Sequence, residues 1–176
     1  MLMTSSEYRD SLRRYKPRVF IDGDRIESVA DEPRLAPGIN AIGLTYDYAL
    51  KDELRQLMTA TQAATGSVVN RMLHINQGTS DLLNKLEAVR ILCQETGCAQ
   101  RYLVHDGFNA LFQATHRIDA DKGTEYHQRF LAYLKHAGDN DLTCGIAMTD
   151  AKGDRSKRPH KQGNPDTYVH LSLIHI

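Results

Sequence analysis

Three consecutive segments with helical periodicity fill the middle of the chain, and they constrain the fold more than any other feature. Apolar residues recur at spacings of three and four over residues 79–95, 101–116 and 124–137, as in amphipathic helices. Gly97 and Gly138 stand where the first and third segments stop, a common place for glycine. Such helices bury their apolar stripes by packing on one another, so the sequence predicts a mainly α domain. The residues expected to face its core are Leu82, Leu86, Val89 and Cys93, then Leu103, Val104, Phe108, Leu111 and Phe112, then Tyr126, Phe130, Tyr133, Leu134 and Ala137.

The N-terminal end of the chain carries two strong local signals. The first is a capping box, because Thr4 can cap a helix and Glu7 follows three positions later. The second is the dipeptide Asp22-Gly23 between two short runs, which is typical of a type I′ turn. We therefore expect a helix that starts at Thr4 and then a small β-hairpin near residues 18–27.

Two further helical patterns precede the long helices. Apolar residues at helical spacing occur over residues 39–49, and the pattern continues over residues 52–61 before it breaks at Gly66. The pair Val68-Val69 after the break suits a short extended piece.

Composition and charge exclude several classes of protein. Charged residues make up 25% of the chain and the formal net charge is zero, so nothing indicates a nucleic-acid partner. No apolar run approaches the roughly 20 residues that cross a bilayer, and residues 1–16 lack the apolar core of a secretory signal. Three cysteines, an odd count without an export signal, indicate free thiols in a reducing, cytoplasmic compartment.

The last part of the chain differs from the helical part. Leu142–Met148 is short and apolar, so we expect a strand, and a single strand is unstable without partners. We therefore expect a helical domain over residues 1–140 and the incomplete start of a β domain over residues 141–170. Residues 171–176 resemble the translation of an adapter used in sequencing libraries, and we expect them to be an artefact that follows a cut in a longer gene product.

A basic loop follows the expected strand. Five cations lie within ten residues around Gly153, with hydroxyl and carboxylate side chains beside them. Such a loop can wrap a pyrophosphate, because backbone N–H groups approach at the glycine and arginine offers a planar fork. The alternative is a solvated turn whose charges face water. The cations are Lys152, Arg155, Lys157, Arg158 and Lys161, and the polar neighbours are Thr149, Asp150 and Asp154.

Several long stretches match one known family in order. They are MLMT, VFIDGDRIE, CAQR, HDGFNALF, GTEYHQRFLAYL, and MTDAKGDRS with NDL before it and PH and NPD after it. On these stretches nearly all of residues 1–170 resembles the flavoprotein family of 4-hydroxyphenylacetate 3-hydroxylase and 4-hydroxybutyryl-CoA dehydratase, nearer the dehydratase branch. The resemblance implies a fold like that of the acyl-CoA dehydrogenases. This chain would supply its N-terminal helical domain and the truncated start of its middle β domain, without the C-terminal helical bundle.

The resemblance also implies an FAD site. In the family FAD lies across the β domain and a TDPKGDR loop contacts it. The loop of this chain has Ala151 where the family usually has proline, a change that removes no contact group. Carried over residue by residue, the FAD contacts would be Met148, Thr149, Asp150, Lys152, Gly153, Asp154 and Arg155.

The dehydratase branch carries in addition a [4Fe-4S] cluster, whose first two thiolate ligands form a C-x-x-x-C pair. Cys98 matches the first ligand, but Tyr102 stands at the second, and tyrosine is a poor ligand for a cluster that prefers soft thiolates. We therefore expect no normal cluster. The alternative role for Cys93, Cys98 and Cys144 is that of small buried hydrophobes.

Arg101, Tyr102 and His105 are candidate substrate-binding residues. At helical spacing Arg101 and His105 share a face, and Tyr102 and His105 can adjoin. In the family this helix borders the substrate and flavin cavity, so a Tyr–His pair could hold a phenolic or thioester oxygen, or move a proton. The alternative is that Tyr102 packs in the core and His105 bonds a backbone carbonyl.

The resemblance implies an FAD-dependent enzyme with a small-molecule substrate, present here as its N-terminal part. A monooxygenase would receive reduced flavin from a partner reductase and hydroxylate a phenol, whereas a dehydratase would remove water from a 4-hydroxyacyl-CoA. We expect the parent to be a homo-tetramer with no nucleic-acid or membrane partner, and the fragment alone to be inactive. The alternative from another class is a non-catalytic helical module that binds a partner through exposed apolar faces, without flavin.

Overall fold

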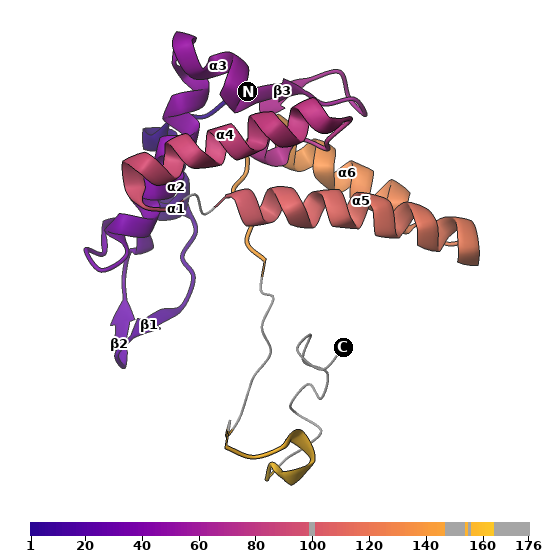
Figure 1. The fold of residues 1–176 in the computed structure, drawn as a ribbon. Coiled ribbons are helices and arrows are strands. Elements are labelled where there is room, and N and C mark those ends of the chain that lie inside the picture. Colours follow the sequence, from indigo (N-terminus) through magenta and orange to yellow (C-terminus); the bar gives the residue numbers. More distant parts are fainter. Residues whose placement is uncertain (99–100, 147–153, 155, 164–176) are drawn as a thin grey trace. The chain divides into compact units, whose positions relative to one another are not determined.

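The structure is a computed structural model, and the residues that it describes are 1–98, 101–146, 154 and 156–163. The chain divides into two compact units, which are coloured along the sequence in Figure 1. The first unit, Met1–Cys144, contains the helices and hairpins. In the described part of the second unit, Gly145–Ile176, the regular structure is a 3-10 turn, η3 (Pro159–Lys161).

Helix α1 (Ser5–Arg14) begins with the predicted capping box. The Thr4 hydroxyl accepts a hydrogen bond from the Glu7 N–H at 3.1 Å, and the Glu7 carboxylate accepts one from the Thr4 N–H at 2.7 Å. Tyr8 of this helix stacks on Tyr46, with ring centroids 5.1 Å apart. The cap therefore fixes the start of a helix whose buried Tyr8 packs on an aromatic ring from another helix.

The predicted hairpin is confirmed. Strands β1 (Val19–Ile21) and β2 (Asp24–Ile26) pair antiparallel. The two residues between them have positive φ, 53° at Asp22 and 91° at Gly23, which is the backbone that a type I′ turn requires.

Two helices and a second hairpin follow. Helices α2 (Ala36–Leu50) and α3 (Asp52–Met58) lead into strand β3 (Thr59–Thr61), which pairs antiparallel with β4 (Val68–Asn70). The helix predicted over residues 52–61 is thus wrong in its last three positions, because β-branched threonines there pair with β4 instead. The 3-10 turns of this part are η1 (Val29–Asp31) and η2 (Arg71–Leu73).

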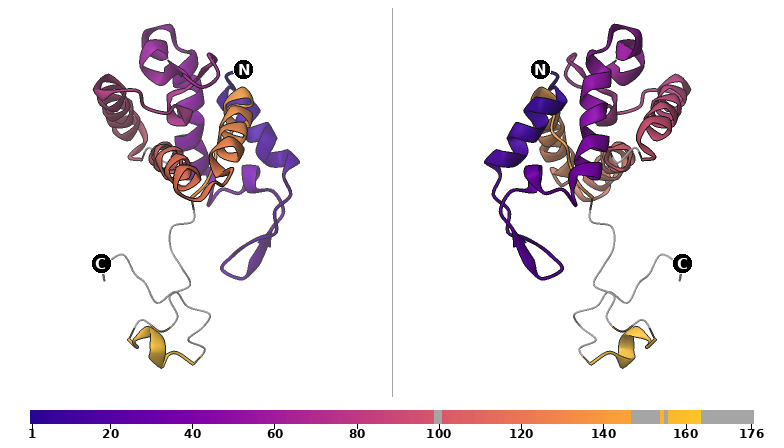
Figure 2. Two further views of the ribbon diagram at one scale, coloured as in Figure 1. Left: turned by 90° about the vertical axis from the view of Figure 1, so that its right-hand side faces the viewer. Right: turned by 90° about the vertical axis from the view of Figure 1, so that its left-hand side faces the viewer.

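Three long helices complete the first unit: α4 (Thr79–Thr96), α5 (Tyr102–Lys122) and α6 (Tyr126–Asp139). Figure 2 shows α5 and α6 packed side by side. Gly97 ends α4 in the left-handed conformation, with φ of 72°, as predicted. Helix α5 runs past its predicted end to Gly123, which has φ of 64°.

Gly138 does not end α6, contrary to the prediction, because the helix continues to Asp139. A Cβ atom at Gly138 would lie 3.0 Å from Cγ1 of Val69 in β4. The glycine therefore allows α6 to approach β4 closely, and its role is packing rather than termination.

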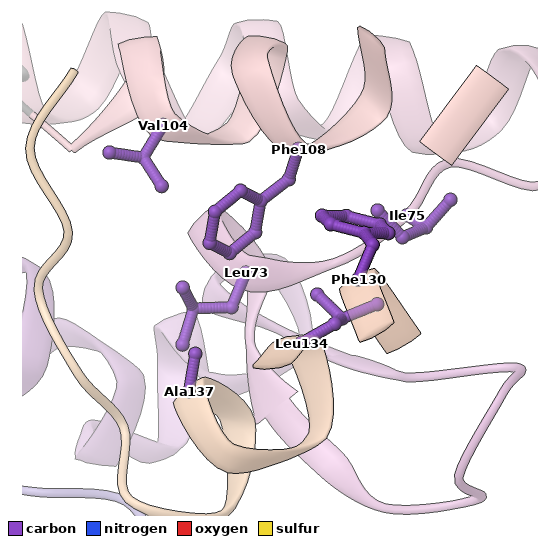
Figure 3. Close-up of a cluster of buried hydrophobic side chains, with 7 residues drawn as sticks. All are labelled: Leu73, Ile75, Val104, Phe108, Phe130, Leu134 and Ala137. Carbon is purple, nitrogen blue, oxygen red and sulfur yellow. The ribbon is translucent and has the colours of Figure 1, made fainter. Parts of the chain in front are cut away.

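The largest buried cluster joins α5 and α6 to η2, as Figure 3 shows. Phe108 from α5 meets Phe130 from α6 edge to face, with ring centroids 5.9 Å apart. Five residues that the periodicity predicted for the core of these helices are buried: Val104, Phe108, Phe130, Leu134 and Ala137. Leu73 and Ile75 complete the cluster.

The predicted core stripe of α4 is wrong at Leu82, Leu86 and Cys93, whereas Val89 is partly buried and packs against the core. Leu82 and Leu86 are 48% and 58% exposed, and Cys93 is exposed. The buried side chains of this helix are Ala88 and Leu92, which pack against α2, α3 and η2. Apolar residues lie on two sides of α4, and periodicity alone does not say which side meets the other helices. Three further residues expected in the core are also half-exposed: Leu111, Tyr126 and Tyr133.

Residues 142–146 do not form the predicted strand. Among the described residues no strand pairs with this run, and a single strand is unstable without partners. The end of the predicted strand, residues 147–148, and the expected artefact, residues 171–176, lie outside the described residues. In the part of the chain that the structure describes, no helix combines the length and apolarity that would be needed to cross a membrane.

Candidate cofactor and substrate site

Of the predicted FAD contacts, the structure describes Asp154. The other predicted contacts lie outside the described residues: Met148, Thr149, Asp150, Lys152, Gly153 and Arg155.

Asp154 organises a tight turn in the second unit. Its Oδ1 accepts hydrogen bonds from the N–H and the hydroxyl of Ser156, at 3.0 and 2.6 Å, and its Oδ2 pairs with Lys157 Nζ at 3.2 Å. The side chain of Gln162 closes the turn, since it accepts from the Asp154 N–H at 3.0 Å and donates to the Asp154 carbonyl at 2.7 Å. The hydrogen bond from the Ser156 hydroxyl contributes most to lowering the pKa of the Asp154 carboxyl. Asp154 thus stabilises the turn through its carboxylate.

Arg101 lies directly before α5, and only 2% of it is exposed. Its guanidinium donates to Thr45 Oγ1 and Asp141 Oδ1, both at 3.1 Å, and to the Leu142 carbonyl at 3.2 Å. It also lies 4.3 Å from the centroid of the Tyr46 ring, within the range of a cation–π contact. All its described contacts are therefore with the protein itself.

Asp141 is the buried counter-charge of Arg101, with 1% exposed. Its φ is 44°, in the left-handed region that aspartate tolerates better than most residues. Its second carboxylate oxygen accepts a hydrogen bond from the Met3 N–H at 3.1 Å. One carboxylate thus joins the N-terminus, the start of α5 and the segment after α6.

His105 is fully buried on α5. Its Nδ1 lies 3.0 Å from the Arg71 carbonyl oxygen, which confirms the alternative in which His105 bonds a backbone carbonyl. Because a carbonyl only accepts, Nδ1 carries the proton and Nε2 presents a lone pair. Nε2 is buried without a partner among the described residues. Burial lowers the pKa of His105 below its ordinary value of 6.5, so the ring is neutral at pH 7.

A second buried histidine, His74, was not singled out by the sequence analysis. Its Nε2 lies 3.3 Å from Asp81 Oδ2, and its Nδ1 has no partner in the described parts of the chain. Asp81 also faces Arg71 at 3.4 Å, and burial lowers the pKa of His74. The buried guanidinium of Arg71 donates in addition to three carbonyls, those of Gln56, Leu57 and Thr59. No sequence spacing signals this cluster, because its members come from η2, the segment after it and α4.

Of the three predicted substrate-binding residues, Tyr102 is the one that is partly exposed. Its ring packs against the cluster that holds Met72 and Leu92, and Lys85 Nζ lies 5.9 Å from its centroid. Arg101 and His105 are both buried, but they bond different segments. Arg101 donates to Thr45 in α2 and to Asp141, whereas His105 bonds the Arg71 carbonyl in η2. The structure therefore separates one accessible residue from two buried ones.

The residues at Cys98 differ from the C-x-x-x-C pair that the family resemblance implies. Cys98 is a half-buried free thiol, and Tyr102 stands where the second thiolate would be. Within the described ranges, no group of three His, Cys, Asp or Glu side chains is placed to hold a metal ion. A phenol hydroxyl does not replace the soft thiolate that such clusters use.

A family model described as 4-hydroxyphenylacetate 3-hydroxylase N terminal matches residues 4–172. The chain belongs to this family. The match includes the helical unit and the basic loop, which confirms the resemblance on which the predicted fold depends.

Curated relatives represent two activities of the family. The 4-hydroxybutyryl-CoA dehydratase/vinylacetyl-CoA-Δ-isomerase of Clostridium aminobutyricum is 41% identical over 172 residues, which cover 97% of this chain and 35% of the relative. The oxygenase component of 4-hydroxyphenylacetate 3-monooxygenase of Thermus thermophilus is 23% identical over 175 residues, 99% of this chain and 35% of the relative. The chain therefore spans about a third of the length of these relatives.

Solved structures of both kinds resemble the described fold. An oxygen-tolerant archaeal 4-hydroxybutyryl-CoA dehydratase from N. maritimus matches with a TM-score of 0.86 and 40% identity, over 95% of this chain and 33% of that one. The oxygenase component of a 4-hydroxyphenylacetate 3-monooxygenase complexed with FAD matches with a TM-score of 0.70 and 22% identity, over 93% and 34%. The second likeness is evidence of fold alone. Together they confirm the mainly α N-terminal domain that was predicted.

Proposed function

We propose that the complete protein is an FAD-dependent enzyme of this family that acts on a phenolic or a 4-hydroxyacyl-CoA substrate. The family match over residues 4–172 carries the proposal, because the matched segment includes the basic loop as well as the helices. A neighbour of the same fold is complexed with FAD, which supports flavin as the cofactor.

In this proposal the basic loop binds the FAD pyrophosphate. Gly153 lets backbone N–H groups approach, and Lys152 and Arg155 provide the charge-assisted hydrogen bonds. The negative charge of Asp154 is compatible with phosphate binding by the loop. Its carboxylate already accepts a hydrogen bond from Ser156 and pairs with Lys157 within the turn. The bound flavin would supply the electron chemistry, while the chain supplies binding and orientation.

On the substrate side we assign Tyr102 as the contact and Arg101 and His105 as positioning residues. Tyr102 has accessible surface, so its hydroxyl can meet a phenolic or thioester oxygen. The ion pair of Arg101 fixes the start of α5, and the hydrogen bond of His105 fixes the next turn against η2. Direct contact of a substrate with His105 would require Nε2 to become uncovered.

The choice between the two chemistries depends on two observations that point in different directions. The 41% identity to a dehydratase favours a 4-hydroxyacyl-CoA substrate. Tyr102 at the second thiolate position disfavours a step through an iron–sulfur cluster. We therefore propose a flavoprotein related to the dehydratases that works without the cluster. A monooxygenase served by a flavin reductase is the alternative enzyme, and for either enzyme a homo-tetrameric parent remains part of the proposal.

A second candidate function is a helical interaction module without flavin. The observation that favours it is the apolar surface of α4, where Leu82, Leu83 and Leu86 are 48%, 61% and 58% exposed. Exposed apolar clusters of this kind are typical of protein-binding faces.

Titration of the complete gene product with FAD separates the two candidates. We expect the wild type to bind FAD and a Lys152→Ala/Arg155→Ala double variant to bind it at least about 100-fold more weakly, since each of the two charge-assisted hydrogen bonds contributes about 1.5–3 kcal/mol. The matched control is Lys16→Ala/Arg18→Ala, which removes two exposed cations far from the loop in sequence. Equal affinity of the loop variant and the control would reject the assigned contacts. A wild type that binds no FAD would favour the interaction module.

A further inference from the structure

Two histidine rings meet between α5 and α6, and the proposed function uses neither of them. His116 lies near the C-terminal end of α5, and His127 lies at the start of α6. The centroids of the two rings are 5.2 Å apart, and the rings meet edge to face. Tyr102 is the first residue of α5, so the histidine pair lies toward the opposite end of this helix from the proposed substrate contact.

The ring of His127 is held in one orientation. It meets the ring of Phe112 edge to face, with centroids 4.9 Å apart, and its Nδ1 lies 3.0 Å from Thr115 Oγ1. The Thr115 hydroxyl donates its hydrogen to the Leu111 carbonyl at 2.7 Å, so it accepts a hydrogen bond from Nδ1. Nδ1 therefore carries the proton, and Nε2 presents a lone pair. Histidines that bind metal ions have this arrangement, in which the other ring N–H donates to a protein oxygen.

The separation of the two rings fits two ligands of one metal ion. Zn–N bonds are about 2.0–2.1 Å long, so two imidazoles in a tetrahedral site have ring centroids roughly 5 Å apart. The observed 5.2 Å agrees with this value. His116 is exposed, so its ring can turn a nitrogen lone pair toward His127 without displacing core residues. The carboxylate of Asp119 accepts a hydrogen bond from the His127 N–H at 2.8 Å and adds negative charge beside this residue.

We infer that His116 and His127 bind a divalent transition-metal ion such as Zn²⁺, with water at the remaining coordination positions. Imidazole nitrogen suits zinc, copper and nickel, whereas Mg²⁺ and Ca²⁺ prefer oxygen ligands. Two protein ligands are fewer than the three of a catalytic zinc site, so the role assigned to the ion is structural. It joins the end of α5 to the start of α6, and because it binds the folded chain it stabilises that chain. The inference does not depend on flavin binding, because both histidines belong to Met1–Cys144.

Calorimetric titration of the untagged chain with zinc chloride, without flavin, tests this inference. The exposed thiol of Cys93 would compete for zinc, so every sample carries Cys93→Ser, while Cys98 and Cys144 stay the same in all samples. We expect saturable binding of about one Zn²⁺ per chain and none of Mg²⁺. Saturating zinc should also raise the urea midpoint of unfolding, because the ion binds the folded chain.

Three variants and one matched control locate the site. His116→Gln and His127→Gln should each weaken zinc binding at least about tenfold, because each removes one of two protein ligands. Thr115→Val removes the oxygen that orients His127 and should weaken binding about tenfold, since loss of such a partner typically costs roughly 10–100-fold. The control, His136→Gln, replaces an exposed histidine of α6 outside the pair and should bind zinc as the parent does.

Several results would overturn the inference. They are zinc binding that does not saturate, an affinity that neither His116→Gln nor His127→Gln changes, and an equal loss of affinity in His136→Gln. An affinity unchanged in Thr115→Val would refute the orientation assigned to His127. Because flavin is absent from the titration, failure of the complete protein to bind FAD leaves this result unaffected, and the converse also holds.

Discussion

Replacement of Asp141 by asparagine tests how the buried ion pair holds the start of α5. Asparagine has nearly the same shape and also tolerates positive φ, so the backbone at 44° should remain unstrained. The change therefore removes a charge and one acceptor oxygen, so that either Arg101 or the Met3 N–H also loses its hydrogen bond to this side chain. It leaves the guanidinium of Arg101, which is 2% exposed, without its counter-charge.

The size of the effect follows from the contacts. Loss of one partner of a buried ion pair costs about 3–5 kcal/mol, because the remaining charge is uncompensated. Arg101 would keep its bonds to Thr45 and the Leu142 carbonyl and its contact with Tyr46, so we expect the lower end, about 3 kcal/mol. For a chain of this size that corresponds to a fall in Tm of roughly 6–12 °C.

Urea unfolding followed by far-UV circular dichroism measures this loss in a chain dominated by helix. The matched control is Asp139→Asn, two residues away, whose ion pair with Lys135 is exposed and should contribute no more than about 0.5 kcal/mol. The double variant Arg101→Met/Asp141→Asn should be less destabilised than the sum of its two single variants, because it leaves no unpaired charge. If Asp141→Asn cost no more than Asp139→Asn, the assigned role of the pair in positioning α5 would be refuted.

Three further predictions concern the cap, the buried histidines and the close helix contact. Thr4→Ala should lower the free energy of unfolding by about 1 kcal/mol through loss of the capping box, and an unchanged urea midpoint would argue against it. Burial lowers the pKa of His105, so the unfolded chain takes up a proton at a higher pH than the folded chain does. The free energy of unfolding should therefore decrease by up to about 1.4 kcal/mol per pH unit below the ordinary pKa of 6.5. A free energy of unfolding that stays constant between about pH 7 and pH 5 would contradict this. Gly138→Ala should fail to give the roughly 1 kcal/mol that alanine usually adds to a helix, whereas in a Val69→Ala background it should stabilise; equal effects in both backgrounds would show that the 3.0 Å contact is unimportant.

Features determined by neighbouring residues were predictable from the sequence. The capping box at Thr4, the turn at Asp22-Gly23 and the stop at Gly97 each depend on a few adjacent positions with a defined backbone requirement. The family resemblance depended on long ordered stretches, and the family match confirms it.

Features determined by distant packing were not predictable. The side of α4 that turns inward depends on α2, α3 and η2, and two apolar sides made the stripe at Leu82 and Leu86 as plausible as the one at Ala88 and Leu92. Gly138 has the same local sequence context as a helix stop, but its neighbour Val69 in β4 decides its role. Periodicity identifies an amphipathic helix, and tertiary contacts then select its buried face.

The candidate site shows the same division. The helix that carries Tyr102 and His105, with Arg101 directly before it, was predicted. The pairing of Arg101 with Asp141, 40 positions away, has no local signal. The cluster of His74, Asp81 and Arg71 likewise joins separate elements. Spacing along one helix shows which residues can be neighbours, and it does not show which partners they choose.

The flavin content of the complete gene product, purified without added cofactor, tests the central claim most directly. We predict a yellow protein that releases FAD on denaturation in about one equivalent per chain. A folded protein that is colourless as purified, and remains so after incubation with excess FAD, would contradict the claim that this chain is part of a flavin-dependent enzyme.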